Sequence, residues 1–319
     1  MPTLRYVTCD VFTDTPFTGN PLAVVFGAEG LPDETLLAIT REFNYSETTF
    51  VFAAETPGTT RRVRIFTPGG EVPFAGHPTL GTAHVLVATG VVKPNVDDGG
   101  TAMLQVVLGE NVGPVPVRVQ CENGVPVFAQ LTTAQPAEER TDGVPSIAAL
   151  ADVLGLTLDD FVGNTHAPAA VSCGLPFLIV PLASVEAVRR ARVHHDAWAR
   201  HLRGTWASEP LVFALMTSDA DRVDLPEGVR DVDIRARVFV PGLSVPEDPA
   251  TGSANACLAA YLAARTPRDG TLRWRVAQGV EMGRPSRLEL EAQKTAGVVS
   301  SIRVAGASVI IAEGTIRLR

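Results

Sequence analysis

The chain carries one sequence pattern twice, and this repeat constrains the fold more than any other feature. The first copy reads Arg-Ile-Phe-Thr-Pro-Gly over 64–69, and the second reads Arg-Val-Phe-Val-Pro-Gly over 237–242. Each copy leads to an ionisable residue that a proline follows, His77 in the first and Asp248 in the second. A Gly-Thr-Ala or Gly-Ser-Ala sequence begins four residues after each of them. A repeat of this length indicates a duplicated domain.

Two further pairs of segments occur in the same order and extend the repeat. Residues 19–25 match residues 174–180, and residues 46–52 match residues 208–213, where both members begin with Ser-Glu. With 319 residues the chain is also longer than an average single domain. We therefore expect two similar domains.

The domain boundary is expected near the middle of the chain. Residues 132–143, rich in Pro, Glu and Ala, are the best candidate for a linker. We expect an N-terminal lobe over 1–131 and a C-terminal lobe over 132–319, and the last strand is a candidate to return to the N-terminal lobe.

Composition excludes several classes of function. With 45% hydrophobic and 19% charged residues, the chain can bury a large core. The net charge of −8 argues against nucleic acid as a partner, because such binding needs a concentrated basic face. No apolar run approaches the length of a membrane span and no signal sequence is visible, so no membrane partner and a cytoplasmic location are expected. The four cysteines form no Cys-x-x-Cys pair, so no metal is expected.

Each half has the pattern of a mixed sheet curled around one buried helix. The segments 78–89 and 250–264 are small and apolar on nearly all sides, which is typical of a central helix. The remainder is rich in alternating strand patterns, so an α+β fold is expected. The region 272–319 reads as strands separated by turns at Gly279, Gly283, Gly306 and Gly314.

The paired positions of His77 and Asp248 suggest a divided catalytic site. A helix that starts at a Gly-containing turn presents unpaired backbone N–H groups and the positive end of its dipole, and it therefore attracts a carboxylate. If the two halves face each other, His77 and Asp248 converge on one cleft that suits a small acidic substrate. Gly252 and Ser253 would then hold the substrate's carboxylate.

Glu47 is the candidate general base of this site. A carboxylate in a closed apolar cleft gains a raised pKa by desolvation, as removal of a proton from carbon requires. Structural alternatives stay open at this stage. Glu47 could be a surface residue at a strand start, and His77 and Asp248 could be helix caps. Catalytic roles are favoured because the matched positions of the two copies hold different ionisable residues, as a divided catalytic site would require.

Other catalytic and cofactor motifs are not found in the sequence. There is no Gly-x-Gly-x-x-Gly or phosphate-loop motif, so no nucleotide cofactor is implied. No Gly-x-Ser-x-Gly elbow is present, which disfavours a serine hydrolase. His194 and His195 are neighbours on a predicted helix and do not share a face, so metal binding there is disfavoured.

Five ordered motifs occupy residues 10–21, 44–50, 74–82, 247–254 and 278–286. Together they resemble the phenazine-biosynthesis PhzF-like isomerase family. The resemblance spans nearly the whole chain and implies the fold of the diaminopimelate epimerase superfamily, which has two similar lobes, each a β-sheet wrapped round a central helix.

The resemblance also implies roles for individual residues. Glu47 would be the proton-transferring carboxylate, assisted by His77 and Asp248. The substrate's carboxylate side would be bound by Gly76, Gly252 and Ser253. The resemblance implies a reaction in which trans-2,3-dihydro-3-hydroxyanthranilate is isomerised by moving a proton, without metal or organic cofactor. A homodimer is expected on the same ground.

Three hypotheses follow from the sequence. The leading one is a cofactor-independent isomerase that moves a proton on a small cyclic or aromatic-like carboxylic acid. The second is an amino-acid epimerase that uses carboxylate and His in place of paired thiols, and the third is a non-catalytic small-molecule-binding relative. Because only the first copy has the context Asn-Tyr-Ser-Glu-Thr-Thr-Phe, we assign the base to Glu47 and interpret Glu209 as its structural counterpart.

Overall fold

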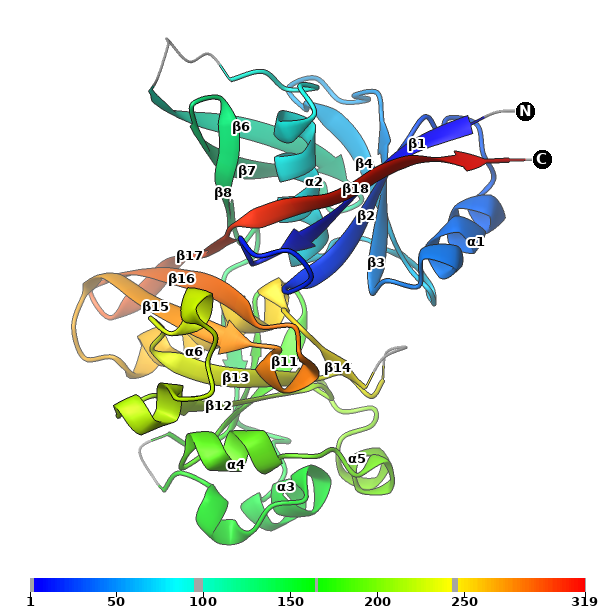
Figure 1. The fold of residues 1–319 in the computed structure, drawn as a ribbon. Coiled ribbons are helices and arrows are strands. Elements are labelled where there is room, and N and C mark those ends of the chain that lie inside the picture. The colour runs from blue at the N-terminus through cyan, green and yellow to red at the C-terminus, as the bar shows by residue number, and fades with distance from the viewer. Residues whose placement is uncertain (1–2, 95–99, 164–165, 243–245, 319) are drawn as a thin grey trace. The chain divides into compact units, whose positions relative to one another are not determined.

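The structure is a computed structural model that describes residues 3–94, 100–163, 166–242 and 246–318. The chain divides into two compact units (Figure 1). Unit 1 comprises Met1–Thr132 together with Ala305–Arg319, and unit 2 comprises Thr133–Val304.

Unit 1 is built on one mixed sheet. Its neighbouring strands run in the order β18, β1, β2, β3, β4, β6, β7, β8, with β5 beside β4. The pairs β2–β3 and β4–β6 are parallel and the others are antiparallel. The strands are β1 (Thr3–Val11), β2 (Asn20–Phe26), β3 (Glu47–Phe52), β4 (Arg61–Thr67), β5 (Gly70–Val72), β6 (Thr101–Glu110), β7 (Gly113–Glu122), β8 (Val125–Thr132) and β18 (Ser308–Arg317).

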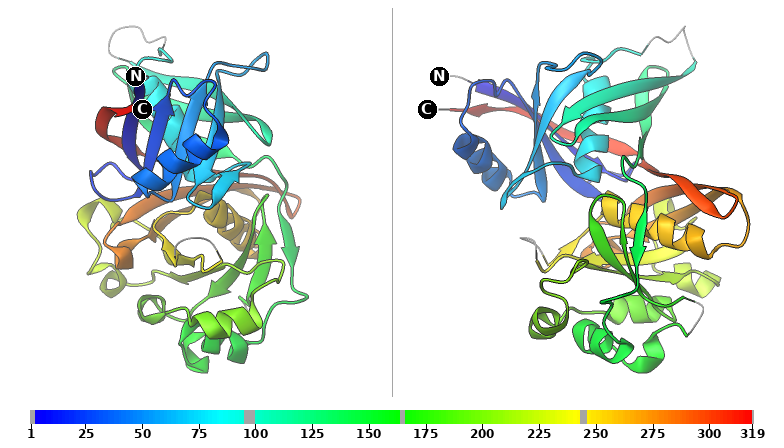
Figure 2. Two further views of the ribbon diagram at one scale, coloured as in Figure 1. Left: turned by 90° about the vertical axis from the view of Figure 1, so that its right-hand side faces the viewer. Right: turned by 180° about the vertical axis from the view of Figure 1, so that it is seen from behind.

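Helix α2 (Gly76–Ala88) is the centre of unit 1. Every residue from Gly76 to Val87 is buried, and the helix contacts β1, β2, β3, β6, β7, β8 and β18 (Figures 1 and 2). A Cβ atom on Gly81 would lie 2.6 Å from Leu22 and 2.7 Å from Val11, so glycine permits the close approach of the helix to β1 and β2. The predicted central helix is confirmed, although it begins two residues before Pro78.

Helix α1 (Asp33–Phe43) covers a second core region of unit 1. Its apolar side buries Leu36 and Ile39 against Val25, Phe50 and Phe66. The helix contacts the strands β3 and β4.

The C-terminal strand β18 pairs antiparallel with β1, beside the N-terminal end of the chain (Figure 2). Gly314 lies inside this strand opposite Tyr6, and a Cβ atom on Gly314 would lie 2.6 Å from the Tyr6 hydroxyl. The sequence-based turn at Gly314 was therefore wrong. Glycine is required there by cross-strand packing and not by a reversal of the chain.

Unit 2 repeats the strand arrangement of unit 1. Its strands pair in the order β9, β10, β11, β12, β13, β15, β16, with β14 beside β13. The pairs β11–β12 and β13–β15 are parallel. The strands are β9 (Glu138–Arg140), β10 (Ala169–Ser172), β11 (Pro176–Pro181), β12 (Pro210–Leu215), β13 (Ile234–Phe239), β14 (Glu247–Asp248), β15 (Gly270–Gln278), β16 (Ser286–Thr295) and β17 (Val298–Gly306), the last of which crosses the unit boundary.

The register of the two sheets matches residue by residue around the repeat. Phe50 pairs with Arg64 in β3–β4, and Val212 pairs with the repeat arginine Arg237 in β12–β13. Helix α6 (Gly252–Arg265) is buried against β10, β11 and β16, as α2 is in unit 1. The predicted α+β class, with a mixed sheet around a central helix in each half, is confirmed.

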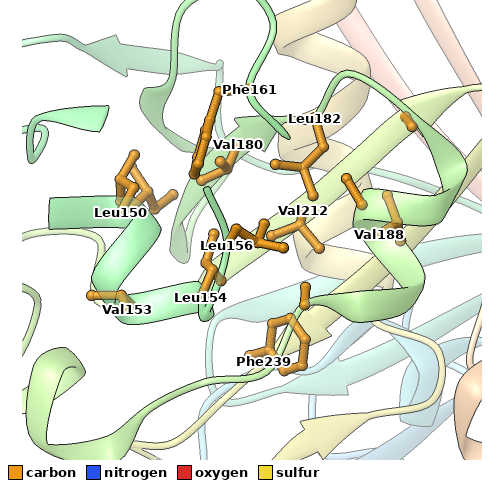
Figure 3. Close-up of a cluster of buried hydrophobic side chains, with 14 of the residues drawn as sticks. Leu150, Val153, Leu154, Leu156, Phe161, Val180, Leu182, Val188, Val212 and Phe239 are labelled. Atoms are coloured by element: carbon orange, nitrogen blue, oxygen red, sulfur yellow. The ribbon is translucent and has the colours of Figure 1, made fainter. Parts of the chain in front are cut away.

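Unit 2 has additional helices that cover its sheet. Side chains of α3, α4 and α5 form a hydrophobic cluster with β12 and β13, and Leu150, Leu154, Val188, Val212 and Phe239 belong to it (Figure 3). The helices of unit 2 other than α6 are α3 (Ile147–Leu154), α4 (Val185–Arg190), α5 (His195–His201), η1 (Leu158–Asp160), η2 (Asp219–Arg222), η3 (Glu227–Val229) and η4 (Val280–Met282).

Within the described ranges, no helix combines the length and the apolar character that crossing a membrane requires.

Candidate functional site

Glu47 and His77 lie together in unit 1. Glu47 is the first residue of β3, and His77 is the second residue of α2. The His77 Nε2 atom lies 3.5 Å from the Glu47 Oε2 atom, and the side chains are only 5% and 18% exposed. A carboxylate and an imidazole at this separation can exchange or share a proton, and such contacts commonly shorten when a substrate binds.

A second set of polar contacts connects Ser46, the residue before Glu47, with the Nδ1 side of His77. The Ser46 hydroxyl donates to Asn20 Oδ1 at 3.0 Å, and Asn20 Nδ2 lies 3.3 Å from His77 Nδ1. Asn20 is fully buried at the start of β2. The Asn20 amide therefore orients the imidazole on its Nδ1 side. The amide is in turn held by Ser46, the residue before Glu47.

Local backbone requirements explain why these strands begin where they do. Gly19 has a φ of +66°, and a Cβ atom there would lie 2.4 Å from the Val11 carbonyl oxygen, so only glycine allows Asn20 to enter β2 at this point. Asn44 ends α1 in the left-handed conformation and donates its N–H to Thr40, which turns the chain toward Glu47.

The His77 imidazole is neutral at neutral pH. Its burial lowers the pKa to about 3, and a hydrogen bond with the backbone of Pro21 opposes this effect only in part. A neutral imidazole has one N–H donor and one acceptor nitrogen. Because Asn20 presents its donor Nδ2 to Nδ1, Nδ1 is the acceptor nitrogen and the hydrogen is on Nε2, which faces Glu47.

Asp248 is a buried residue of unit 2 and ends the short strand β14. Its carboxylate accepts a hydrogen bond from the Thr251 hydroxyl at 2.5 Å. Helix α6 begins at Gly252, two residues later than expected, so Asp248 precedes its helix whereas His77 lies inside the first turn of α2. The two copies have thus diverged in backbone geometry as well as in side-chain chemistry.

The starts of α2 and α6 differ from those of the other described α-helices. Neither has a side-chain cap or an acidic residue in its first turn, whereas α1, α3, α4 and α5 each have at least one of these. Gly76 and Gly252 are the first residues of the two helices and are buried, and Ser253 is half-buried. Helix starts of this kind are suited to an external anion.

Glu110 is a buried carboxyl group that sequence reasoning did not select. It ends β6 and is 5% exposed, and its Oε1 atom accepts a hydrogen bond from the Thr79 hydroxyl at 2.7 Å. Thr79 lies in the first turn of α2, two residues after His77. Burial raises the pKa of Glu110 to about 8, although Thr79 and the charge of Arg62 act in the opposite direction.

Replacing Glu110 with glutamine is expected to remove a pH dependence of stability. The folded chain keeps the Glu110 proton up to about pH 8, while the unfolded chain loses it near the ordinary glutamate pKa of 4.5, so the stability of the wild type falls as pH rises between these values. The glutamine variant is expected to gain thermal stability relative to the wild type from about pH 5 to about pH 8. If the melting temperatures of the wild type and Glu110→Gln change in parallel across this range, the prediction is contradicted. Glu122→Gln, at an exposed position, serves as the control.

Glu209 differs from Glu47 in its surroundings. Its carboxylate accepts hydrogen bonds from Ser208 Oγ at 3.0 Å and from the backbone of Gly242, and a Cβ atom on Gly242 would lie 2.4 Å from it. Burial raises the pKa of Glu209. Its contacts tie together the two repeated segments of unit 2 and, among the residues that the structure describes, include no imidazole, which supports the interpretation of Glu209 as a structural counterpart.

The structure distributes the predicted residues over both units. Unit 1 holds Glu47, Gly76 and His77, which lie close together, and unit 2 holds Asp248 with Gly252 and Ser253 near the start of α6. That both groups act on one substrate stays a prediction. Within the described residues there is no cluster of three or more His, Cys, Asp or Glu side chains that could hold a metal ion.

Asn20, Thr251 and Gln278 contact the candidate residues but were missed as functional positions. A signal for Asn20 is present in the repeat, because the matched position in the second copy is Leu175. This change from amide to apolar side chain parallels the change from His77 to Asp248. Gln278 lies in the motif at 278–286, but the repeat does not mark it, because its side chain reaches the Asp248 carbonyl only once β15 pairs with β13, which also pairs with β14.

Two units that each wrap a mixed sheet around a buried helix define a diaminopimelate epimerase-like fold. A solved probable proline racemase from Agrobacterium radiobacter shares this fold, with a TM-score of 0.62 over 99% of this chain and 93% of that chain, at 14% identity. A solved PhzF-family phenazine biosynthesis protein from Bacillus anthracis matches with a TM-score of 0.83 and 25% identity over 100% of both chains.

Comparisons of sequence define the family within this fold. The family model for phenazine biosynthesis-like proteins (PhzC-PhzF) matches residues 9–314. An uncharacterized isomerase of Mesorhizobium japonicum is 37% identical over 98% of this chain and 99% of the relative. The trans-2,3-dihydro-3-hydroxyanthranilate isomerase of Pseudomonas aeruginosa is 33% identical over 97% of this chain and 98% of the relative. The chain therefore belongs to the phenazine biosynthesis-like family, and its enzyme class is that of the isomerases.

Proposed function

We propose that the protein moves a proton on a small cyclic carboxylic acid, with Glu47 as the group that carries it. The observation that supports this most is the pair formed by Glu47 and His77, whose side chains are 18% and 5% exposed and 3.5 Å apart. Water competes little at such a site. A carboxylate there can accept a proton from one carbon and then donate a proton to the same molecule.

The proposed reaction needs no net change in the protein. The Glu47 carboxylate accepts the proton of a C–H bond, and the electrons of that bond shift the adjacent double bond. The protonated Glu47 exchanges its proton with solvent between the two steps and then donates a proton to a different carbon of the same ring. His77 assists by directing its Nε2–H at the Glu47 carboxylate whenever that group is ionised, and we assign Asp248 an assisting role on the second unit.

The uncapped helix starts support a carboxylate-bearing substrate. Gly76 opens α2, and Gly252 with Ser253 opens α6, and neither helix supplies an acidic side chain of its own to its first turn. We propose that these starts bind the substrate's carboxylate side. The name of the Pseudomonas aeruginosa relative suggests trans-2,3-dihydro-3-hydroxyanthranilate as the first compound to test.

A thermal-shift screen tests the proposed substrate class. Cyclic and aromatic carboxylic acids, beginning with trans-2,3-dihydro-3-hydroxyanthranilate, are expected to raise the melting temperature. At a ligand concentration of 100 times Kd, the free energy of unfolding is expected to rise by about 2.7 kcal/mol. The matching amides, which lack the negative charge, are the controls and are expected to give no shift. Equal shifts with acids and amides would contradict carboxylate binding. Product analysis then distinguishes a moved double bond from inversion at one carbon.

A further inference from the structure

The motif at 278–286 surrounds the backbone next to Asp248. Gln278 Nε2 donates to the Asp248 carbonyl oxygen at 2.8 Å, and Ser286 Oγ donates to the Pro249 carbonyl oxygen at 3.1 Å. A Cβ atom on Gly279 would lie 2.5 Å from the same Pro249 oxygen, and Gly279 has a φ of +73°. The motif therefore holds the turn between β14 and α6 and does not form a separate site.

Gln278 makes contacts that fix the orientation of its amide. Its Oε1 atom accepts from Asn255 Nδ2 at 2.7 Å and from the Thr251 N–H at 3.2 Å. Both partners are donors, so Oε1 is the acceptor and Nε2 faces the other way, toward the Asp248 carbonyl and the Thr251 hydroxyl at 3.1 Å. The side chain is fully buried. All four hydrogen-bonding positions of the amide are therefore occupied.

This orientation determines where the Thr251 hydroxyl proton points. Because Gln278 Nε2 donates to Thr251 Oγ1, the hydroxyl's own hydrogen is available for Asp248 Oδ2, which lies 2.5 Å away. The short contact is of the charge-assisted kind when the carboxylate is ionised. We propose that Thr251 and Gln278 are positioning residues for Asp248, with Gln278 orienting the Thr251 hydroxyl and Thr251 fixing the carboxylate. This inference rests on the proposed role of Asp248.

Unit 1 has a related arrangement, which supports the inference. The strand pair β4–β6 places Gly109 beside Arg62, and the pair β13–β15 places Ala277 beside Arg235. The next residue in each case is Glu110 or Gln278, so these two occupy equivalent positions. Glu110 accepts from Thr79 in the first turn of α2, two residues after His77. Both halves thus use a buried polar residue at the same strand end to hold the start of the central helix.

Substitution of Thr251 tests the proposal, with trans-2,3-dihydro-3-hydroxyanthranilate as the assayed substrate. Thr251→Val removes the hydroxyl but keeps the shape, and it is expected to lower kcat about 10- to 100-fold, the equivalent of a hydrogen bond to a charged group. Thr251→Ser is expected to retain kcat within about twofold, and KM is expected to change by less than about threefold in both variants. Gln278→Glu, which keeps the acceptor and loses the donor, is expected to act like Thr251→Val.

Ser286→Ala is the matched control, because Ser286 holds the same turn without touching the carboxylate. It is expected to lower the melting temperature and to leave kcat within about twofold. An equal loss of kcat in Ser286→Ala and Thr251→Val would overturn the proposal, as would a loss of kcat in Thr251→Ser equal to that in Thr251→Val. In an Asp248→Asn background, Thr251→Val is expected to have little further effect. A fully active Asp248→Asn would instead overturn the role of Asp248 itself.

A spectroscopic readout requires no turnover. The Asp248 carboxyl carbon can be assigned by ¹³C NMR from its absence in Asp248→Asn. Loss of a hydrogen bond that favours the charged form is expected to move the titration of this signal to higher pH in Thr251→Val and to leave it in place in Ser286→Ala. An unchanged titration in Thr251→Val would overturn the proposal even if the enzyme acts on a different substrate.

Discussion

Replacing Glu47 with glutamine is expected to lower kcat by about 10²- to 10⁴-fold, the contribution of a positioned general base. The amide has the shape of the carboxyl group but cannot accept a proton from carbon. The 3.5 Å contact with His77 and the low exposure of both side chains mean that water is poorly placed to substitute for Glu47. The measurement is the steady-state rate with each substrate that the thermal-shift screen identifies, and binding is expected to persist because Glu47 is not assigned to hold the carboxylate.

Glu209→Gln is the matched control for this prediction. The residue occupies the equivalent position of the second copy, has a pKa raised by burial, and is bonded to Ser208 and Gly242. Its substitution is expected to affect stability and to leave kcat within about twofold. If Glu47→Gln retains wild-type turnover, or if Glu209→Gln loses as much as Glu47→Gln, the assignment of the base to the first copy is wrong.

Replacing Arg235 with methionine is expected to lower the free energy of unfolding by about 3 to 5 kcal/mol, because a buried ion pair loses one partner. Arg235 lies in β13 and is 1% exposed, and it donates to Glu281 at 2.9 and 3.0 Å and to Asp224 at 3.1 Å. Without the guanidinium, the 12% exposed Glu281 side chain stays buried beside an apolar group. Urea denaturation followed by fluorescence measures the effect.

Arg273→Met provides the control on the same sheet. Arg273 is 72% exposed and pairs with Glu291, so its loss is expected to cost about 0 to 1 kcal/mol. A further substitution of Glu281 by leucine in the Arg235→Met variant is expected to recover part of the lost stability, because no buried charge is then left unpaired. Similar midpoints for Arg235→Met and Arg273→Met would contradict the role of the buried pair.

The repeat made the fold predictable as far as the order of strands and helices in each half is concerned. The two Arg-containing strands, the matched Ser-Glu strands and the apolar helices all occur at corresponding places in both sheets, as the equal registers of Phe50 with Arg64 and Val212 with Arg237 show. Gly314 shows the limit of such reasoning. A glycine in a strand can mark a turn or a close contact, and only the pairing of β18 with β1 reveals that Tyr6 requires it.

The candidate site was predictable for the residues that the repeat marks. Glu47 and His77 were selected from the repeat and Gly76 from the family resemblance, and the structure brings the three together in unit 1. Gln278 and Glu110 could not be selected, because each reaches the first turn of its helix only through the parallel pairing of distant strands. Their side chains are ordinary in sequence and become informative only through burial and hydrogen bonding.

Solvent deuterium exchange tests the central claim most directly. Wild-type protein, Glu47→Gln and Glu209→Gln are incubated in D₂O with a carboxylic acid that the thermal-shift screen identifies, and ¹H NMR and mass spectrometry follow deuterium at each ring carbon. The account predicts deuterium at the carbon that gains the proton with the wild type and with Glu209→Gln, and loss of this incorporation with Glu47→Gln. Equal incorporation by the wild type and Glu47→Gln would show that Glu47 does not carry the proton.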